Sequence, residues 1–330
     1  MLTNSGTASL EMSALLSRIL PDDEVIMPSY TFSSTANAFI LRGAKPIFVD
    51  ININNLNIDE MKVLNAITNK TKVIVLVHYG GTCCDIDLIK KICIEKNILL
   101  VEDAAQGFLS YYKNKHLGTI GDLGAISFHE SKNITCGEGG ALLVNKKKFI
   151  QRAKILREKG TNRSLFFEGK ISKYNWVDLG SSFLMNDFTA AILEYQIEIS
   201  NLLTKKRLAA WNYYYKHLSI YNEYFKLSMI KDFSLHNAHI FFIILNNRID
   251  RTWLIDYLRK KGISAYFHYS PLHSSPAGKS YGISRGSMKE TNKAANKMLR
   301  LPLWSQISRR QQDYVIDKLI LGINLFFTKN

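Results

Sequence analysis

Short runs of consecutive apolar residues recur along the first 150 positions of the chain, many of them β-branched. They cover residues 24–28, 46–49, 72–77, 98–101, 125–128 and 141–144. Near-continuous apolar runs are typical of strands that are buried on both faces of a parallel sheet. Helical patterns lie between several of these runs, and in residues 86–95 the apolar positions Ile86, Ile89 and Ile92 share one helical face. This alternation predicts an α/β domain with a mostly parallel sheet.

The pattern changes near residue 200. The remaining elements are predicted to be a long helix over 189–200, a strand over 239–245, a helix over 252–258, a strand over 263–268 and a helix over 311–319. This mixture indicates a smaller α+β unit. A length of 330 residues agrees with two domains. We therefore expect a large domain over residues 1–200 and a small C-terminal domain over residues 201–330.

Composition excludes several classes of protein. Apolar residues make up 46% and charged residues 22% of the chain, as in ordinary globular proteins. No apolar run approaches the roughly 20 residues of a membrane span, and the first residues show no secretory signal. The four cysteines have no zinc-binding spacing, so no metal site is expected. Reduced cysteines favour a cytoplasmic enzyme.

The net charge of +15 is distributed unevenly. The first 200 residues carry 22 basic and 21 acidic residues, and the last 130 carry 21 basic and 7 acidic residues. Such a basic half could attract a nucleic acid, a membrane surface or an anionic small substrate. No helix-turn-helix, zinc-finger or RNA-binding signature accompanies it. We therefore expect neither a nucleic-acid nor a membrane partner.

Three features are predicted to meet at the carboxyl ends of the strands, where open α/β sheets bind ligands. Asp103 follows one apolar run, Lys132 follows another, and the small polar turn at residues 4–9 opens a helical pattern. Separately they would be a strand-end acid, a surface lysine and a helix cap. Together they match the needs of pyridoxal 5′-phosphate (PLP): a lysine for covalent attachment, a carboxylate for the ring nitrogen and a helix N-terminus for the phosphate.

The chain resembles the DegT/DnrJ/EryC1/StrS sugar aminotransferases over nearly its whole length. The resemblance rests on the sequences VIMPSYTF (25–32), GAKPIFVD (43–50), VEDAAQ (101–106), SFHESK (127–132), GEGG (137–140), FHYSPLH (267–273) and LPL (301–303). It implies the PLP-dependent transferase fold of type I, which is similar to aspartate aminotransferase. It also implies a homodimer with shared active sites.

Within the family, HESKN (129–133), REKGTNRS (157–164) and GSSFLM (180–185) are similar to members that make a 4-amino sugar for surface polysaccharides. The expected reaction moves the amino group of L-glutamate to C4 of dTDP-4-dehydro-6-deoxy-D-glucose. Its product is dTDP-4-amino-4,6-dideoxy-D-galactose. The alternatives left open are a different regiochemistry or stereochemistry, or another nucleotide.

The resemblance also assigns roles to single residues. Lys132 carries the cofactor and moves a proton, while Asp103 pairs with the ring nitrogen. The remaining cofactor contacts are Phe32 against the ring, Gln106 near its hydroxyl group, and Thr7, Ala8 and Ser127 at the phosphate. Without the resemblance, Phe32 and Gln106 would be unremarkable packing residues.

Other positions are weaker candidates. Ser182 stands where many relatives have an Asn that binds the phosphate of the neighbouring subunit, and Leu184 stands where they have an Arg. His268 is expected near the sugar nucleotide. Arg157 and Arg163 are candidate anion contacts, because arginine offers a two-pronged donor to carboxylates and phosphates.

One departure from the family leaves a further alternative. Relatives carry an N-terminal arm before the turn at residues 4–9, and this chain starts at the turn, so the arm is expected to be missing. A non-catalytic remnant is therefore the competing hypothesis. A related dehydratase is disfavoured, because those relatives have histidine at the position of Lys132.

Overall fold

A large sheet of eight strands organises the molecule, which is a computed structural model that describes residues 1–329. Its strands are β1 (Leu2–Thr3), β2 (Glu24–Pro28), β3 (Lys45–Val49), β4 (Thr71–Val77), β5 (Leu99–Asp103), β8 (Leu123–Ser127), β9 (Gly140–Val144) and β13 (Ile283–Ser284). They lie in the order β1–β9–β8–β5–β4–β2–β3–β13. From β8 to β13 all neighbours are parallel, whereas β9 runs antiparallel to β8 and β1. The six predicted strands and the α/β class are confirmed.

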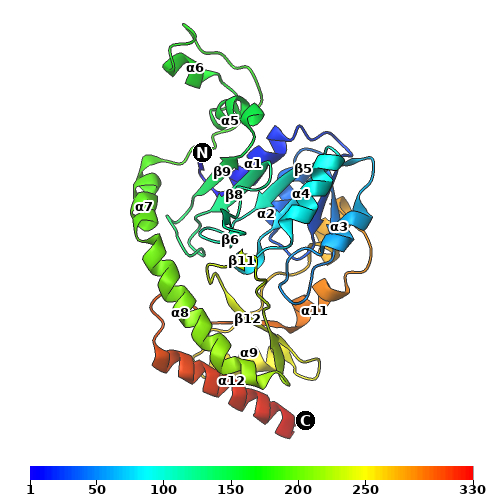
Figure 1. Cartoon of the computed structure of the whole chain (residues 1–330), viewed down its shortest axis with the longest axis vertical. Coiled ribbons are helices and arrows are strands. Elements are labelled where there is room, and N and C mark those ends of the chain that lie inside the picture. Colours follow the sequence, from blue (N-terminus) through cyan, green and yellow to red (C-terminus); the bar gives the residue numbers. More distant parts are fainter. Residues whose placement is uncertain (330) are drawn as a thin grey trace.

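Helices cover both faces of this sheet (Figure 1). They are α1 (Gly6–Leu16), α2 (Ser33–Ile40), α3 (Glu60–Ala66), α4 (Ile86–Glu95) and α5 (Ile150–Arg157). Val25 and Met27 of β2 pack with α1, α2 and α5, while Ile26 between them packs with α3 and α4. Because successive side chains of a strand point to opposite faces and both faces are covered, residues 25–28 of this strand are all apolar. The near-continuous apolar runs therefore reflect burial on both sides.

A second core lies in the C-terminal part. The antiparallel strands β10 (Phe225–Leu227), β12 (Phe241–Leu245) and β14 (Met298–Leu301) pack against α8 (Ser200–Leu218), α9 (Arg251–Lys260) and α12 (Arg309–Lys329). Figure 1 shows α8 and α12 crossing at the end of the molecule where the C-terminus lies. The strand predicted over 263–268 is wrong. Ala265 N bonds to Ile263 O over 3.0 Å, so the chain turns tightly there, and only Tyr266 forms an isolated bridge, to Arg300.

Segments after residue 200 also join the first part of the chain. Strand β13 extends the large sheet beside β3, and β11 (Ser234–Leu235) pairs with β6 (Tyr111–Tyr112), which pairs with β7 (Lys115–His116). Arg285, next to β13, forms two hydrogen bonds with the Glu24 carboxylate, at 2.7 and 3.1 Å. The smaller helices are α10 (Pro276–Tyr281) and α11 (Lys289–Lys297). A domain division at residue 200 stays a prediction.

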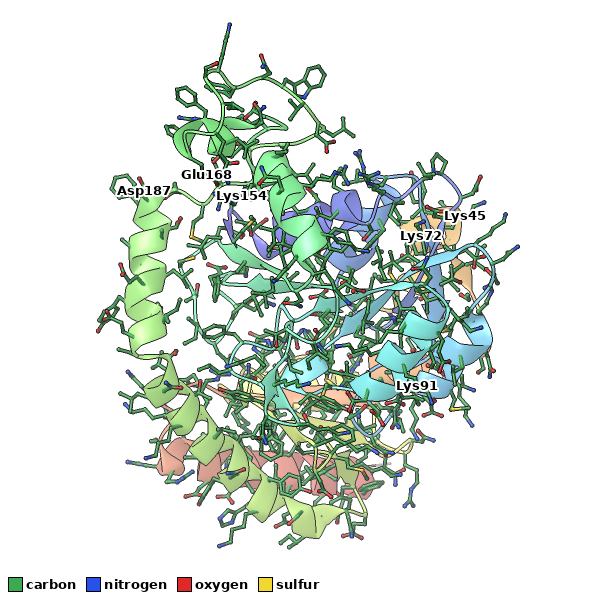
Figure 2. All side chains as sticks on the ribbon, turned by 45° about the horizontal axis from the view of Figure 1, so that its top comes forward. Lys45, Lys72, Lys91, Lys154, Glu168 and Asp187 are labelled. Carbon is green, nitrogen blue, oxygen red and sulfur yellow. The ribbon has the colours of Figure 1, made fainter. Side chains whose placement is uncertain are left out.

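One segment projects from the body. Helix α6 (Arg163–Phe167) extends beyond α5, and the chain returns to α7 (Asp187–Glu198) at the side of the molecule (Figure 1). Lys154 of α5 bonds to Glu168 over 2.7 Å and holds the base of this projection (Figure 2). The helix predicted over 189–200 is α7, which ends before the break at Ile199. Within residues 1–329 no helix combines the length and apolarity needed to cross a membrane.

Candidate functional site

The candidate site lies where the parallel strands β5 and β8 end. Asp103 is the last residue of β5 and Ser127 the last residue of β8, and the two strands pair directly. The N-terminus of α1 lies against Ser127, since a Cβ on Gly6 would be 2.7 Å from the Ser127 Cβ. Strands that run parallel expose their carboxyl ends at one edge, which is where such sheets bind ligands.

Asp103 is buried and held by two hydrogen bonds. Thr35 donates from its hydroxyl group to Oδ2 over 2.7 Å, and the backbone N–H of Ala105 donates to Oδ1 over 3.2 Å. Burial raises the pKa of Asp103 above its ordinary value, although these bonds and the charge of Lys132 oppose the rise. Two hydrogen bonds therefore fix the orientation of the carboxylate, and the charge of Lys132 acts on it without forming an ion pair.

Lys132 lies in the loop between β8 and β9. Burial lowers the pKa of its amino group, and the positive charge of Arg300 lowers it further, while Asp103 acts in the opposite direction. Within residues 1–329 the Nζ atom has no hydrogen-bond or ion-pair partner. A half-buried lysine with a lowered pKa is suited to attack a carbonyl carbon.

The start of α1 is shaped as an anion-binding turn. The Ser5 hydroxyl accepts the N–H of Ala8 over 3.0 Å and caps the helix. Thr7 is hydrogen-bonded to Ser34, in the first turn of α2, over 2.8 Å. Two helix N-termini therefore meet here, each with unpaired N–H groups and the positive end of a helix dipole. Such a place suits a phosphate group.

Gln106 and Phe32 are both neighbours of Tyr269. Gln106 accepts the N–H of Gly80 over 2.7 Å and donates to the Tyr269 hydroxyl over 2.8 Å. The Phe32 ring is 58% exposed, and its centroid lies 6.2 Å from that of Tyr269. The large exposed ring of Phe32 leaves one face free to cover a ligand.

His268 joins the same aromatic group. Its ring stacks on Tyr269 with centroids 3.8 Å apart, and its Nδ1 lies 2.6 Å from the Tyr79 hydroxyl. Burial, followed by the charges of Arg300 and Lys132, lowers the pKa of His268 to about 3. The imidazole is therefore neutral near pH 7, and burial keeps Tyr79 protonated by raising its pKa. We infer that Tyr79 donates to Nδ1.

Three residues that the sequence analysis proposed as site residues, Ser182, Arg157 and Arg163, are not among the residues grouped around Lys132. Ser182 is exposed, and its carbonyl accepts Asn4 Nδ2 over 3.0 Å, so it borders the turn before α1. Arg157 ends α5, and its buried Nε has no partner in the described chain. Arg163 lies in the projecting helix α6, over the Phe167 ring. In a single copy of the chain, Arg163 stays outside the group around Lys132.

Sequence reasoning missed several residues of the site. Thr35 is hydrogen-bonded to Asp103, and Tyr269 is hydrogen-bonded to Gln106. Tyr79 is hydrogen-bonded to His268. Tyr269 could have been found, because it follows His268 in the quoted motif. The role of Thr35 depends on the first turn of α2 lying near the end of β5, which no local pattern indicates.

The site residues fit PLP. An unpartnered Lys132 amine, a buried Asp103 carboxylate and the cradle at α1 and α2 supply the three attachments that the cofactor needs. Gly6 leaves no room for a side chain beside Ser127, so the backbone of the turn lies close to the strand end. When PLP is bound, we expect Lys132 to hold it covalently and Asp103 to contact its ring nitrogen.

Comparison with known proteins gives a consistent result. The sequence profile of the DegT/DnrJ/EryC1/StrS aminotransferase family matches residues 1–320. An uncharacterized protein of Methanocaldococcus jannaschii, MJ1066, is 34% identical over 95% of this chain and 82% of its own length. The spore coat polysaccharide biosynthesis protein SpsC of Bacillus subtilis is 31% identical over the same shares of the two chains.

Solved structures agree with this match. The aminotransferase TlmJ of Streptoalloteichus hindustanus has a TM-score of 0.90 at 27% identity, over 98% of this chain and 86% of its own. The putative sugar aminotransferase Spr1654 of Streptococcus pneumoniae, in its PMP form, has a TM-score of 0.91 at 25% identity, over 99% and 87%.

Proposed function

Because the chain belongs to the DegT/DnrJ/EryC1/StrS aminotransferase family, and is thus a PLP-dependent sugar aminotransferase, we propose its two substrates. The amino donor is L-glutamate. The acceptor is dTDP-4-dehydro-6-deoxy-D-glucose, which receives the amino group at C4. The product is dTDP-4-amino-4,6-dideoxy-D-galactose for a surface polysaccharide, a common antigen or an O-antigen.

The observation that carries the transaminase chemistry is the meeting of Lys132, Asp103 and the start of α1 at one sheet edge. PLP supplies, when bound, an electron-accepting ring and a place to store the amino group between the two half reactions. Lys132 would hold it covalently and would then move a proton between the donor Cα and C4′ of the cofactor. Asp103 keeps a proton on the ring nitrogen, and Thr35 fixes the direction of that carboxylate.

Of the remaining candidate residues, some bind the cofactor and others bind the substrate. Ser127, Thr7 and Ala8 bind the phosphate, Phe32 covers the ring and Gln106 lies near its hydroxyl group. His268 is neutral and contacts the sugar nucleotide from the side of Tyr79. The choice of a dTDP-linked 4-keto sugar rests on the resemblance of residues 129–133, 157–164 and 180–185. The name of the Bacillus subtilis relative SpsC supports a role in polysaccharide biosynthesis.

We also propose a homodimer with shared active sites. Its support is a series of large apolar side chains, from α6 through α7, that are exposed in the single chain: Phe167 (70%), Trp176 (77%), Phe188 (87%) and Tyr195 (60%). Exposed apolar surface of this kind marks interaction sites. Ser182, Arg157 and Arg163 border this region, and in a dimer they would serve the partner's site. A cytoplasmic location is part of the same proposal.

The first experiment tests cofactor attachment. Borohydride reduction of the PLP-loaded protein should fix the cofactor on the peptide that contains Lys132. Lys132→Ala should lower turnover by at least about 1000-fold, while Lys154→Ala, a lysine of the projecting segment, should change neither result. Retained turnover of glutamate by Lys132→Ala would refute the assignment.

The second experiment tests the substrate. The purified enzyme is given L-glutamate with dTDP- and UDP-linked 4-keto and 3-keto sugars, and the products are identified by NMR. A 4-amino-galacto product from the dTDP sugar supports the proposal. A 3-amino product, the gluco epimer or a preference for UDP establishes one of the alternatives. No product with any sugar, together with weak PLP binding, establishes the non-catalytic remnant.

A further inference from the structure

Arg300 has no role in the family-based assignment, yet it faces the candidate site. It lies in β14, where Leu299 and Leu301 pack into the C-terminal core, while Met298 packs with Tyr30 and Tyr79. Side chains alternate along a strand, so Arg300 shares the face of Met298. That face is directed away from the C-terminal core and toward the aromatic group of the site.

The neighbours of Arg300 confirm this placement. On one side its partner in the sheet is Phe242, whose ring lies 5.9 Å from that of Tyr79. On the other side Arg300 exchanges two backbone hydrogen bonds with Tyr266, at 2.7 and 3.2 Å. Tyr266 is two residues before His268, which bonds to Tyr79. Arg300 is thus fixed between two segments that line the site.

The guanidinium of Arg300 has no protein partner in residues 1–329. No ion pair or side-chain hydrogen bond involves it, although it is half-buried. By contrast, Arg207 donates to the carbonyls of Ala238 and His239, and Arg251 donates to the carbonyl of Met298. A guanidinium has five N–H donors, and leaving them unsatisfied in a partly buried place is costly.

The charges around Arg300 point to an anionic ligand. Its positive charge reaches Lys132 and His268, whose pKa values it lowers. The negative charge of Asp103 acts on Lys132 without forming an ion pair, and the Asp103 carboxylate already accepts hydrogen bonds from Thr35 and Ala105. The described residues near Arg300 therefore provide an excess of positive charge that an oxyanion would balance.

We propose that Arg300 binds an oxyanion of a substrate, either the carboxylate of the amino donor or a phosphate of the nucleotide sugar. Arginine suits both, because its fork of donors matches the geometry of carboxylates and phosphates. This inference rests on the proposed function, since it names the group that meets the substrates of that same site. Arg300 would bind and orient the substrate without transferring a proton.

The test compares Arg300→Met with Arg259→Met in the PLP-loaded protein. Arg259 is an exposed arginine of α9 whose side chain has Asp256 as its only partner in the described residues, so it controls for the loss of one positive charge. The probes are glutarate, a non-reacting dicarboxylate, and dTDP, and their dissociation constants are measured by calorimetry. PLP content and thermal midpoint are recorded for each variant.

Arg300→Met should weaken one probe by about 10- to 100-fold, the effect of losing a charged hydrogen-bonded pair. Weaker glutarate binding identifies the donor carboxylate, and weaker dTDP binding identifies the nucleotide phosphate. Weakening of both with normal PLP content and midpoint shows one shared subsite. Arg300→Lys should fall between wild type and Arg300→Met, because it keeps the charge and loses the fork.

Several outcomes would overturn the proposal. One is a change of less than twofold in the dissociation constants of both probes, and another is an equal effect of Arg259→Met. A third is that the wild type binds neither probe. The last is that Arg300→Met loses the binding of both probes together with its PLP content and its thermal stability. Equilibrium binding separates this test from the proposed function. If the wild type binds PLP and a probe but makes no amino sugar, the proposed substrates fail while the role of Arg300 is still decided.

Discussion

Thr35 donates its hydroxyl hydrogen to Oδ2 of Asp103 over 2.7 Å, and both side chains are buried. A hydroxyl has a single hydrogen, so the contact of 2.8 Å between Thr35 and Thr31 requires Thr31 to be the donor. Thr31 lies just before α2 and Thr35 lies in its first turn, and together they form a directed chain of hydrogen bonds that ends on the carboxylate. The helix therefore determines which way Asp103 presents its free lone pairs.

Thr35→Val should weaken cofactor binding. Valine keeps the shape of threonine but removes the donor, and the pKa of Asp103 should rise further, because the Thr35 bond lowers it. We expect about a tenfold weaker affinity for PLP, measured by fluorescence titration of the cofactor-free protein. Thr31→Val, which removes only the outer donor, should have a smaller effect. Equal affinities in both variants and the wild type would contradict this role.

The pH dependence of PLP attachment should report the environment of Lys132. The neutral amine is the reactive form, and burial and Arg300 lower its pKa below 10.5. The attachment rate of the cofactor-free protein should therefore reach half of its maximum below pH 10.5. The Asp103 charge raises the Lys132 pKa, so Asp103→Asn should move the midpoint to still lower pH. Lys132→Ala measures attachment at other lysines, and a midpoint at or above pH 10.5 would be inconsistent with the structure.

Gly6→Ala should destabilise the start of α1. The added Cβ would lie 2.7 Å from the Ser127 Cβ and 3.2 Å from its Cα, neither of which is a flexible chain end. Forcing the strand end and the helix apart should cost about 1–3 kcal/mol in the free energy of unfolding, measured by denaturant titration. Adding Ser127→Gly removes the closest contact and should recover part of this loss. If the double variant is no more stable than Gly6→Ala alone, the clash is not the cause.

Acid should destabilise the protein through its buried neutral histidines. Burial lowers the pKa of His239 well below 6.5 and that of His268 to about 3. The unfolded chain takes up these protons near pH 6.5 and the folded chain does not. Stability is therefore complete above pH 7.5 and is lost as the pH falls through 6.5.

The expected loss is about 1 kcal/mol for each histidine between pH 7.5 and 5.5. Denaturant midpoints across this range measure it. His239→Gln, which cannot titrate, should flatten the dependence by the share of one histidine. Its slope should therefore be shallower than that of the wild type, and an identical slope would show that His239 does not contribute.

The sequence predicted the elements whose environment is uniform along their length. Strand β4 is an almost continuous run of buried apolar residues, and helix α4 buries one apolar face. The bounds of α4 are the predicted ones. The pattern failed at residues 263–268, where Ile263 and Ala265 are buried and Tyr266 and Phe267 are exposed. The chain turns at these residues, and the turn places Ile263 and Ala265 in the C-terminal core. The resulting alternation of buried and exposed residues resembles that of a strand, and periodicity alone does not distinguish the two.

The candidate site shows the same division. Asp103 and Lys132 could be predicted because each follows an apolar strand and has a recognisable neighbourhood. Arg300 and Thr35 could not, because their positions depend on how β14 and α2 are placed in three dimensions. Nothing in the residues around Arg300 distinguishes it from a surface cation until its strand face is known.

The last strand of the large sheet comes late in synthesis. Strand β3 ends at Val49, but its outer partner β13 begins at Ile283. A growing chain folds from its N-terminus, so the nascent protein carries an open sheet edge until almost the whole sequence has left the ribosome. Open edges recruit strands from other molecules. The ion pair between Arg285 and Glu24 closes that edge, and cells that slow translation before residue 285 should accumulate more aggregated chains.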